Sequence, residues 1–165
     1  MIALKVETKE LMTKLLTTET FDNFLIVEGT ITTASSFSID GKINREFMND
    51  LNCGDAEIID DYRKWGELRK LSFELVKGKV LPVFFKVVLQ LSEKNKESFL
   101  QSIGSPMKLE DVASLCMNIS FDRKECKIVT GTSIKVFSLD KTLDREWDEM
   151  VKKFLTKNDI AFEEI

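Results

Sequence analysis

Two segments of the chain, residues 37–47 and 137–147, have closely similar sequences. Phe, Ser, Asp, Arg and Glu occur at the same positions in both segments. Most of the positions that differ carry chemically similar residues. Threonines precede the two copies at matching distances, at Thr30, Thr32, Thr130 and Thr132. A repeat of this kind indicates two similar halves, which constrains the fold more than any single predicted element does.

The hydrophobic pattern predicts the same order of elements in both halves: a strand, a helix, two or three strands, and a second helix. The expected strands are 2–6, 24–31, 32–39, 80–91, 115–121, 127–130, 132–138 and 160–164, and the expected helices are 8–16, 60–77, 93–103, 109–113 and 142–157. We expect a turn at Asp40-Gly41 and a long acidic loop over 46–61. A strand is an alternative for 60–77, because part of that segment alternates between apolar and polar residues.

We therefore predict an α+β fold, with an antiparallel sheet and helices packed mainly on one face. We expect a single domain, 1–165, with half-repeats 1–79 and 80–165. Each half would be a β-α-β-β(-β)-α unit, and a pseudo-twofold axis would relate the two. The offset between matching residues varies along the chain, so a duplication requires insertions, and a chance match is the alternative.

The sequence contains no histidine, which excludes histidine-based nucleophilic triads, histidine-ligated zinc and histidine general acid–base catalysis. Glycine-rich phosphate loops, the nucleophile elbow and the EF-hand loop are also missing. We therefore expect no catalytic, cofactor-binding or metal-ligating residue, and the sequence favours a protein that is not an enzyme. The net charge of −4 gives no general attraction to nucleic acid or anionic lipid.

The sequence predicts neither a secretory signal nor a membrane span. The first ten residues lack the basic and apolar regions of a signal peptide. The longest apolar stretch, 80–91, is too short to span a bilayer and is interrupted by Pro82 and Lys86. We expect a cytoplasmic protein without membrane association.

The chain has three cysteines, Cys53, Cys116 and Cys126. Because their number is odd and no CxxC spacing occurs, free thiols are expected. A hairpin that turns near residues 123–124 would place Cys126 opposite Phe121 and Cys116 near Gly131. The two thiols would then be too far apart for a disulfide.

Asp40 and Asp140 occupy the same position in the two motif copies, so a pseudo-twofold axis could bring their carboxylates together. Two close carboxylates can hold a hard cation or share a proton. A structural role is favoured, because Asp40 precedes a turn and Asp140 precedes a helix. Asp commonly bonds local backbone N–H groups at such places.

Residues 62–86 carry a local charge of +5, since seven cations face only Glu67 and Glu74. The cations are Arg63, Lys64, Arg69, Lys70, Lys77, Lys79 and Lys86. With aromatic residues nearby, the segment could bind phosphate or nucleic acid. The candidate contacts are Arg63, Lys64, Arg69 and Lys70. On a helix, however, cations and acids would alternate along one face, and this pattern favours a solvated, salt-bridged surface.

Six short motifs are spread over the chain. They are Ile2-Ala3-Leu4-Lys5-Val6, Thr20-Phe21-Asp22-Asn23-Phe24, Phe37-Ser38-Ile39-Asp40-Gly41, Leu75-Val76-Lys77-Gly78-Lys79, Thr130-Gly131-Thr132-Ser133 and Trp147-Asp148-Glu149-Met150. In combination they resemble a domain-of-unknown-function family of small proteins from anaerobic Gram-positive bacteria, and the similarity covers essentially the full chain. The resemblance implies a stand-alone protein of the bacterial cytoplasm, and it carries no activity, ligand or catalytic residue.

We therefore expect a non-enzymatic binding or interaction module whose partner is a protein or a small ligand, and a homodimer remains open. The first alternative is a nucleic-acid-binding protein that uses the basic segment 62–86. The second alternative is a carboxylate- and metal-dependent hydrolase that uses Asp40 and Asp140.

Overall fold

The computed structural model describes residues 1–51 and 58–165, which form a seven-stranded antiparallel sheet in the order β3-β2-β4-β5-β6-β1-β7. The strands are β1 Ala3–Val6, β2 Leu25–Thr32, β3 Ser36–Asp40, β4 Phe84–Gln90, β5 Val112–Phe121, β6 Cys126–Ile134 and β7 Phe162–Glu164. The α-helices are α1 Thr8–Thr17, α2 Arg45–Asp50, α3 Trp65–Val76, α4 Glu93–Ser102 and α5 Thr142–Lys157. The predicted α+β class is confirmed.

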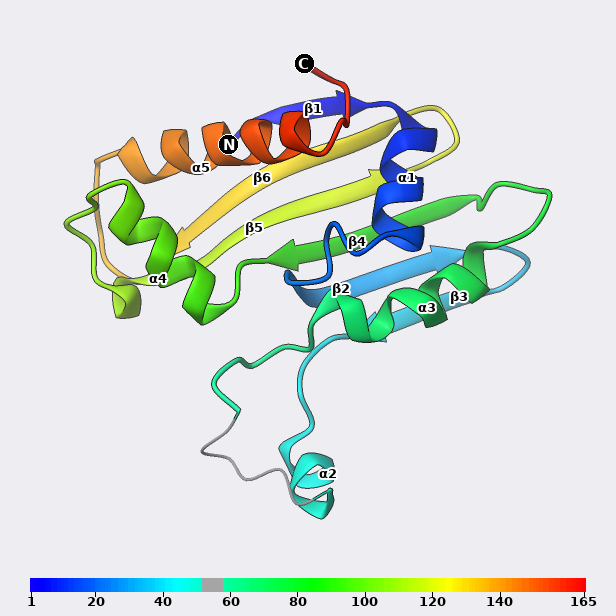
Figure 1. Cartoon of the computed structure of the whole chain (residues 1–165), viewed down its shortest axis with the longest axis horizontal. Coiled ribbons are helices and arrows are strands. Elements are labelled where there is room, and N and C mark those ends of the chain that lie inside the picture. The colour runs from blue at the N-terminus through cyan, green and yellow to red at the C-terminus, as the bar shows by residue number, and fades with distance from the viewer. Residues whose placement is uncertain (52–57) are drawn as a thin grey trace.

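Helices α1, α3, α4 and α5 lie on the same side of the sheet, whereas α2 lies beyond the β3 edge (Figure 1). The burial of β4 alternates accordingly. Phe85, Val87 and Leu89 are buried beneath the helices, and Lys86 and Val88 point to the opposite face. The predicted packing of helices mainly on one face is confirmed.

An apolar stripe explains how α5 packs against the sheet. Leu143, Trp147, Val151 and Leu155 recur every four residues along this helix, and all four are buried. Trp147 also donates its indole N–H to the Cys116 carbonyl of β5 at 2.9 Å, so its one polar atom is satisfied in the core. None of the described helices combines the length and the apolar character that crossing a bilayer requires.

Three predicted strand boundaries are wrong. The chain turns at 33–35, between β2 and β3, where the Thr33 N–H donates to the Ser35 carbonyl at 2.9 Å. Neither Gly nor Pro marks that turn in the sequence. β6 is one strand where two were predicted, because Gly131 stays in register opposite Cys116. Residues 135–138 leave the sheet.

The predicted helix over 60–77 begins later, at Trp65. Tyr62 and Lys64 form isolated β-bridges with Lys42 and Leu25, so the chain before the helix is extended. The predicted loop over 46–61 allowed for one helical turn, and α2 is a short helix of six residues at its start.

Two more predicted elements are shorter than expected. Residues 80–83 lie outside β4, because Pro82 has no N–H to donate to the ladder. Within the predicted 109–113 helix, only Leu109–Asp111 is helical, as a 3₁₀ turn, and Val112 already pairs with Ile134 at the start of β5.

The two halves do not pair their strands in the same way. β4 pairs with β5 in the second half, whereas β1 pairs with β6 and β7 and not with β2. The first motif copy begins within β3, and residues 137–141 of the second copy lie outside any helix or strand. The described residues therefore do not show the internal duplication, which stays a prediction.

Candidate functional site

The two candidate carboxylates lie on different parts of the sheet. Asp40 ends β3 at one edge, and Asp140 precedes α5 beside β6. Strands β2, β4 and β5 lie between β3 and β6. Four strand spacings of about 4.8 Å separate the two positions by roughly 19 Å. The structure therefore does not bring Asp40 and Asp140 together.

Each carboxylate bonds its own local backbone. Asp40 Oδ1 accepts a hydrogen bond from the Lys42 N–H at 2.9 Å. Asp140 Oδ1 accepts from the Thr142 hydroxyl at 2.7 Å and from the Thr142 N–H at 2.9 Å, and these two bonds lower the pKa of Asp140. Among the described residues, no group of three or more acidic or cysteine side chains could hold a metal ion. These contacts favour the structural role for both residues.

Ion pairs neutralise much of the basic segment 62–86. The pairs are Arg63–Glu67, Arg69–Asp22, Lys77–Glu74 and Lys86–Glu28. Lys64 and Lys70 make no ion pair within the described part of the chain. Of the four candidate contacts for nucleic acid, Arg63 and Arg69 are therefore ion-paired, whereas Lys64 and Lys70 make no ion pair with a described residue. This arrangement favours the salt-bridged surface, and nucleic-acid binding stays a prediction.

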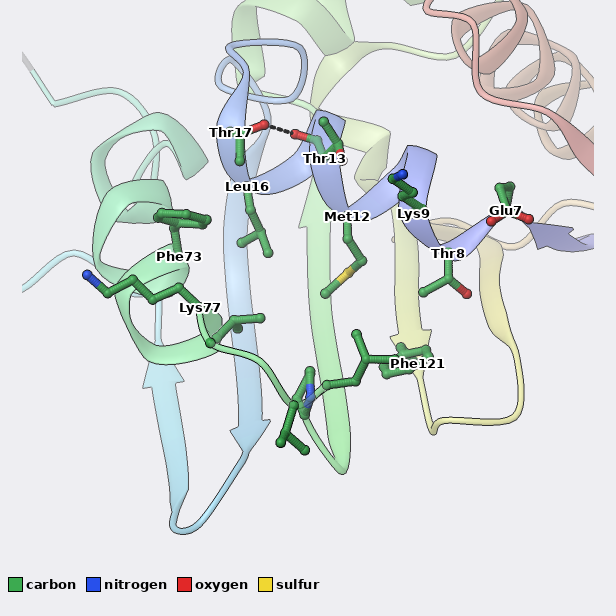
Figure 2. A pocket seen from close by; sticks show the side chains of 15 residues that line it. Glu7, Thr8, Lys9, Met12, Thr13, Leu16, Thr17, Phe73, Lys77 and Phe121 are labelled. Atoms are coloured by element: carbon green, nitrogen blue, oxygen red, sulfur yellow. Dashed lines mark hydrogen bonds between the residues drawn. The ribbon is translucent and has the colours of Figure 1, made fainter.

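A groove of about 570 Å³ lies between α1, the last turn of α3 and the segment that follows α3 (Figure 2). We call it the α1–α3 groove. Met12 and Leu16 point into it from α1, Phe73 lines it from α3, and Phe121 lines it from the end of β5. Most of its wall is therefore apolar.

Two contacts, one buried and one partly buried, hold α3 against α1 and against the loop that follows α1. The Trp65 indole N–H of α3 donates to the Leu15 carbonyl of α1 at 2.8 Å, which ties the two helices directly. Arg69 donates from Nε and Nη2 to the two carboxylate oxygens of Asp22, at 2.8 and 3.2 Å. The spacing of α1 and α3 is therefore fixed by side chains that do not line the groove.

The third wall is the segment 77–83, which turns away from α3 at Gly78. Gly78 has a φ of +148°, a backbone conformation that side-chain-bearing residues rarely adopt. Val80 and Leu81 follow it and are 71% and 62% exposed. Arg123 supports them from the β5–β6 turn, because its guanidinium donates to the Leu81 carbonyl at 2.9 Å and to the Pro82 carbonyl at 3.3 Å.

Charged side chains lie at the rim of the groove. Lys9 and Lys77 supply two cations, and Glu7 supplies one carboxylate. Lys77 is paired with Glu74, whereas Lys9 makes no ion pair with a described residue. Because Glu74 balances Lys77, the rim is left with the cation of Lys9 and the carboxylate of Glu7 over an apolar interior.

The sequence pattern does not reveal this groove. Leu11, Leu15 and Leu16 form the apolar face of α1 that the pattern predicts, and all three are buried. Met12 lies beside that face and looks like an ordinary flanking residue. Residues 80–81 look like the start of a buried strand. The exposure of Val80 and Leu81, which marks the third wall of the groove, is known from the structure and not from the sequence.

Cys116 and Cys126 confirm the predicted hairpin register. Cys126 pairs with Phe121, Cys116 pairs with Gly131, and both thiols are free. Burial raises the pKa of Cys126 to about 12, with a further contribution from the charge of Glu7, and burial also raises the pKa of Cys116. Neither thiol is therefore a nucleophile at neutral pH. Cys53 lies outside the described residues.

Comparison with known proteins identifies a family but no activity. No curated protein sequence and no solved structure matches the chain. The model of a family of unknown function, DUF5721, matches residues 14–163. That match covers β2 to β6 and the groove residues from Leu16 onward, and it leaves out β1 and the groove residues of α1 up to Thr13. The chain therefore belongs to the DUF5721 family of unknown function.

Proposed function

We propose that this protein is a non-enzymatic binding module and that the α1–α3 groove holds a single-chain amphiphile with an anionic head. The observation that carries the proposal is an apolar groove of about 570 Å³ whose rim bears Lys9 and Lys77. Small-molecule sites commonly have volumes of about 300–1,000 Å³, mostly apolar walls and a few charged groups that orient the ligand.

The size of the groove favours a small ligand over a partner helix. Two turns of an α-helix, about 10 Å wide and 11 Å long, fill roughly 850 Å³. A helix of that size would leave much of its surface outside the groove. In contrast, Thr8, Met12 and Leu16 line the groove over about 12 Å of the α1 axis. This narrow apolar track suits an extended hydrocarbon chain.

The rim favours an anionic head group. Lys9 is a cation without an ion-pair partner among the described residues, whereas Glu74 balances the charge of Lys77. We propose that the head group contacts Lys9 and not Glu7, the other unbalanced charge of the rim. We expect the effect to be modest, because exposed ion pairs are weak.

Binding rather than catalysis is proposed because the residues of the groove offer little reactive chemistry. The chain has no histidine, and neither Cys116 nor Cys126, whose pKa values burial raises, lines the groove. We further propose one domain over 1–165, supported by the continuous sheet. A bacterial, cytoplasmic setting is proposed on the resemblance described above.

A head-group series tests the proposal. Isothermal titration of the full chain with dodecanoate, dodecanol and dodecylamine should give the tightest binding for dodecanoate and the weakest for dodecylamine. Lys9→Gln should weaken dodecanoate by about two- to fivefold, the range of exposed ion pairs, and should leave dodecanol unchanged. Lys5→Gln is the matched control, because Lys5 is exposed on β1 and does not line the groove.

A second variant tests the location. Met12→Trp should fill the groove and weaken dodecanoate at least about tenfold. Met48→Trp, a change of the same kind outside the groove, should leave binding unchanged. Equal binding of all three amphiphiles would refute the anionic preference. Unchanged dodecanoate binding by Met12→Trp would refute the site.

A further inference from the structure

Strand β3 is an edge strand without the usual protection. It pairs with β2 on one side, and no other described strand pairs with it. The segment Ser36–Asp40 contains no Lys, no Pro and no bulge, which are common devices that keep edge strands from pairing. The opposite edge, β7, is three residues long and carries Glu163 and Glu164. Within the described part of the chain, β3 is therefore the edge that is open to a further strand.

The hydrogen bonds around β2 show which backbone groups of β3 face outward. The Gly41 N–H donates to the Val27 carbonyl of β2 at 3.0 Å. In an antiparallel pair, alternate residues direct their N–H and C=O groups to opposite sides. Phe37 and Ile39 therefore share the direction of Gly41 toward β2. The backbone groups of Ser36, Ser38 and Asp40 point away from the sheet.

A hydrogen bond on the β4 side of β2 supports the outward direction of the Ser36 backbone groups. The Thr32 carbonyl accepts from the Val83 N–H, next to β4, at 2.8 Å. Thr32 is the residue opposite Ser36. The backbone groups of Thr32 thus point to β4, so the Thr32–Ser36 pair is not hydrogen-bonded and Ser36 faces outward.

These three outward residues define one symmetric register for a second copy of β3. If a twofold axis passes through Ser38, each Ser38 exchanges both backbone bonds with the other Ser38. Ser36 of each copy then pairs with Asp40 of the other in the same way. In this register all the outward backbone groups of both strands are satisfied. An axis through Phe37 would instead place Asp40 opposite residue 34, outside the strand.

The same register brings Phe37 to a second groove. A cavity of about 360 Å³, which we call the β3 groove, is lined by apolar residues that include Ile39, Phe47, Leu68 and Leu71, and by the charged residues Asp40, Lys42 and Arg63. With the axis through Ser38, Phe37 of one copy stands opposite Ile39 of the other, on the helix side of the sheet. The phenyl ring therefore lies at the mouth of the β3 groove. Aromatic and β-branched residues are favourable cross-strand partners.

The surroundings favour a second copy over other occupants. Leu71 and Phe47 are 56% and 59% exposed at this edge, and α2 lies beyond β3, where a paired copy would meet it (Figure 1). Asp40 is the single charged residue of the strand. The antiparallel register sets each Asp40 against a neutral Ser36 and keeps the two carboxylates about 14 Å apart.

We propose that the protein forms a homodimer in which two β3 strands pair antiparallel about Ser38 and join the two sheets into one. Phe37 of each copy lies at the mouth of the β3 groove of the other. The interface is independent of the α1–α3 groove, because the two grooves share no lining residue.

The first test is the mass of the full chain in solution, measured by light scattering over a concentration series. The expected result is a dimer for the wild type and for Ser38→Ala, because the pairing uses the backbone of Ser38. Ser38→Pro removes an outward N–H that β2 does not use, so it should give a folded monomer. A wild type that is monomeric at every concentration would overturn the proposal, as would a dimeric, folded Ser38→Pro.

Cysteine substitutions test the register and do not depend on the proline variant. In a Cys53→Ser background, Ser38→Cys should form an intermolecular disulfide under mild oxidation. A hydrogen-bonded antiparallel pair has Cα atoms about 5.5 Å apart, within disulfide range. Ser36→Cys is the control and should not cross-link, because the two copies of position 36 lie about 14 Å apart. Cross-linking at 36 and not at 38 would overturn the register.

Charge substitution of the aromatic residue completes the test. Phe37→Glu should raise the dimer dissociation constant at least about tenfold, because a carboxylate cannot make the apolar contact with Ile39 that the phenyl ring makes. Phe137→Glu is the matched control, since Phe137 occupies the same motif position and is 91% exposed on another part of the molecule. Equal dissociation constants for the two variants would contradict the proposed contact of Phe37.

Discussion

Replacing Asp22 with Ala tests how α3 is held against the rest of the molecule. The carboxylate of Asp22 accepts two hydrogen bonds from Arg69, and both side chains are mostly buried, 22% and 13% exposed. The backbone beside them adds a second link, since the Asp22 carbonyl accepts from the Gly66 N–H at 3.2 Å. Asp22→Ala removes the side-chain link and leaves the guanidinium without its partner.

The expected cost follows from this geometry. Hydrogen bonds to charged groups contribute about 1.5–3 kcal/mol each, and a fully buried ion pair that loses one partner costs about 3–5 kcal/mol. Because solvent reaches part of both side chains, we expect a loss of about 2–3 kcal/mol in the free energy of unfolding. For a chain of this length, that corresponds to a drop in Tm of about 5–10 °C.

The assay is urea and thermal unfolding followed by circular dichroism. Glu67→Ala is the matched control, because it breaks the exposed ion pair that Glu67 of α3 makes with Arg63, and it should cost at most about 0.5 kcal/mol. The double variant Asp22→Ala/Arg69→Ala should be less destabilised than the sum of the two single variants. If Asp22→Ala costs no more than Glu67→Ala, the Asp22–Arg69 ion pair does not hold α3 in place and the reasoning is refuted.

Two further predictions concern the core. Gly41→Ala should cost about 3 kcal/mol or more in urea unfolding, because the new Cβ would lie 1.7 Å from the Ile26 carbonyl oxygen, whereas Gly29→Ala, whose nearest contact would be 3.4 Å, should cost far less. The raised pKa of Cys126, from 9.0 to about 12, keeps its thiol protonated in the folded chain while the unfolded chain ionises above pH 9. The free energy of unfolding should therefore fall between pH 9 and about 12, by up to about 1.4 kcal/mol per pH unit from this group, and Cys126→Ala should remove that part of the slope. Equal costs for the two glycine variants, or equal slopes with and without the thiol, would contradict these two predictions.

Local patterns predict much of the fold. The alternation in β4 and β5, the four-residue stripe of α5 and the facing of Cys126 with Phe121 all depend on residues close in sequence. The Ser92 cap of α4 is of the same kind, since its hydroxyl accepts from the Asn95 N–H three residues on. Patterns of this sort report which face of an element is apolar.

Long-range pairing could not be predicted in the same way. β1 pairs with β6, more than 120 residues later, and no local pattern distinguishes that partner from β2. The repeat pointed to equivalent halves, yet Thr130 is buried against Asp148 whereas Thr30 lies on the helix-free face opposite Lys86. The two threonines, although they occupy the same position relative to the two motif copies, thus lie in different environments.

The two grooves were hidden for the same reason. Each is built from segments far apart in the chain, such as Met12 with Leu81, or Ile39 with Leu71. The candidate carboxylates were suggested by the repeat alone, and the sheet order separates them. The ion pair between Arg69 and Asp22 likewise shows that part of the basic segment serves the fold.

Methyl NMR of methionine-labelled protein tests the proposed ligand groove most directly, because three methionines report on three different cavities. Met12 lines the α1–α3 groove, Met48 lines the β3 groove, and Met107 lines a polar pocket beside α5. On titration with dodecanoate, the Met12 methyl signal should shift with a saturable dependence while those of Met48 and Met107 stay in place. A saturable shift of Met48 or Met107 with Met12 unchanged would contradict the proposed groove, as would a Met12 signal that never moves.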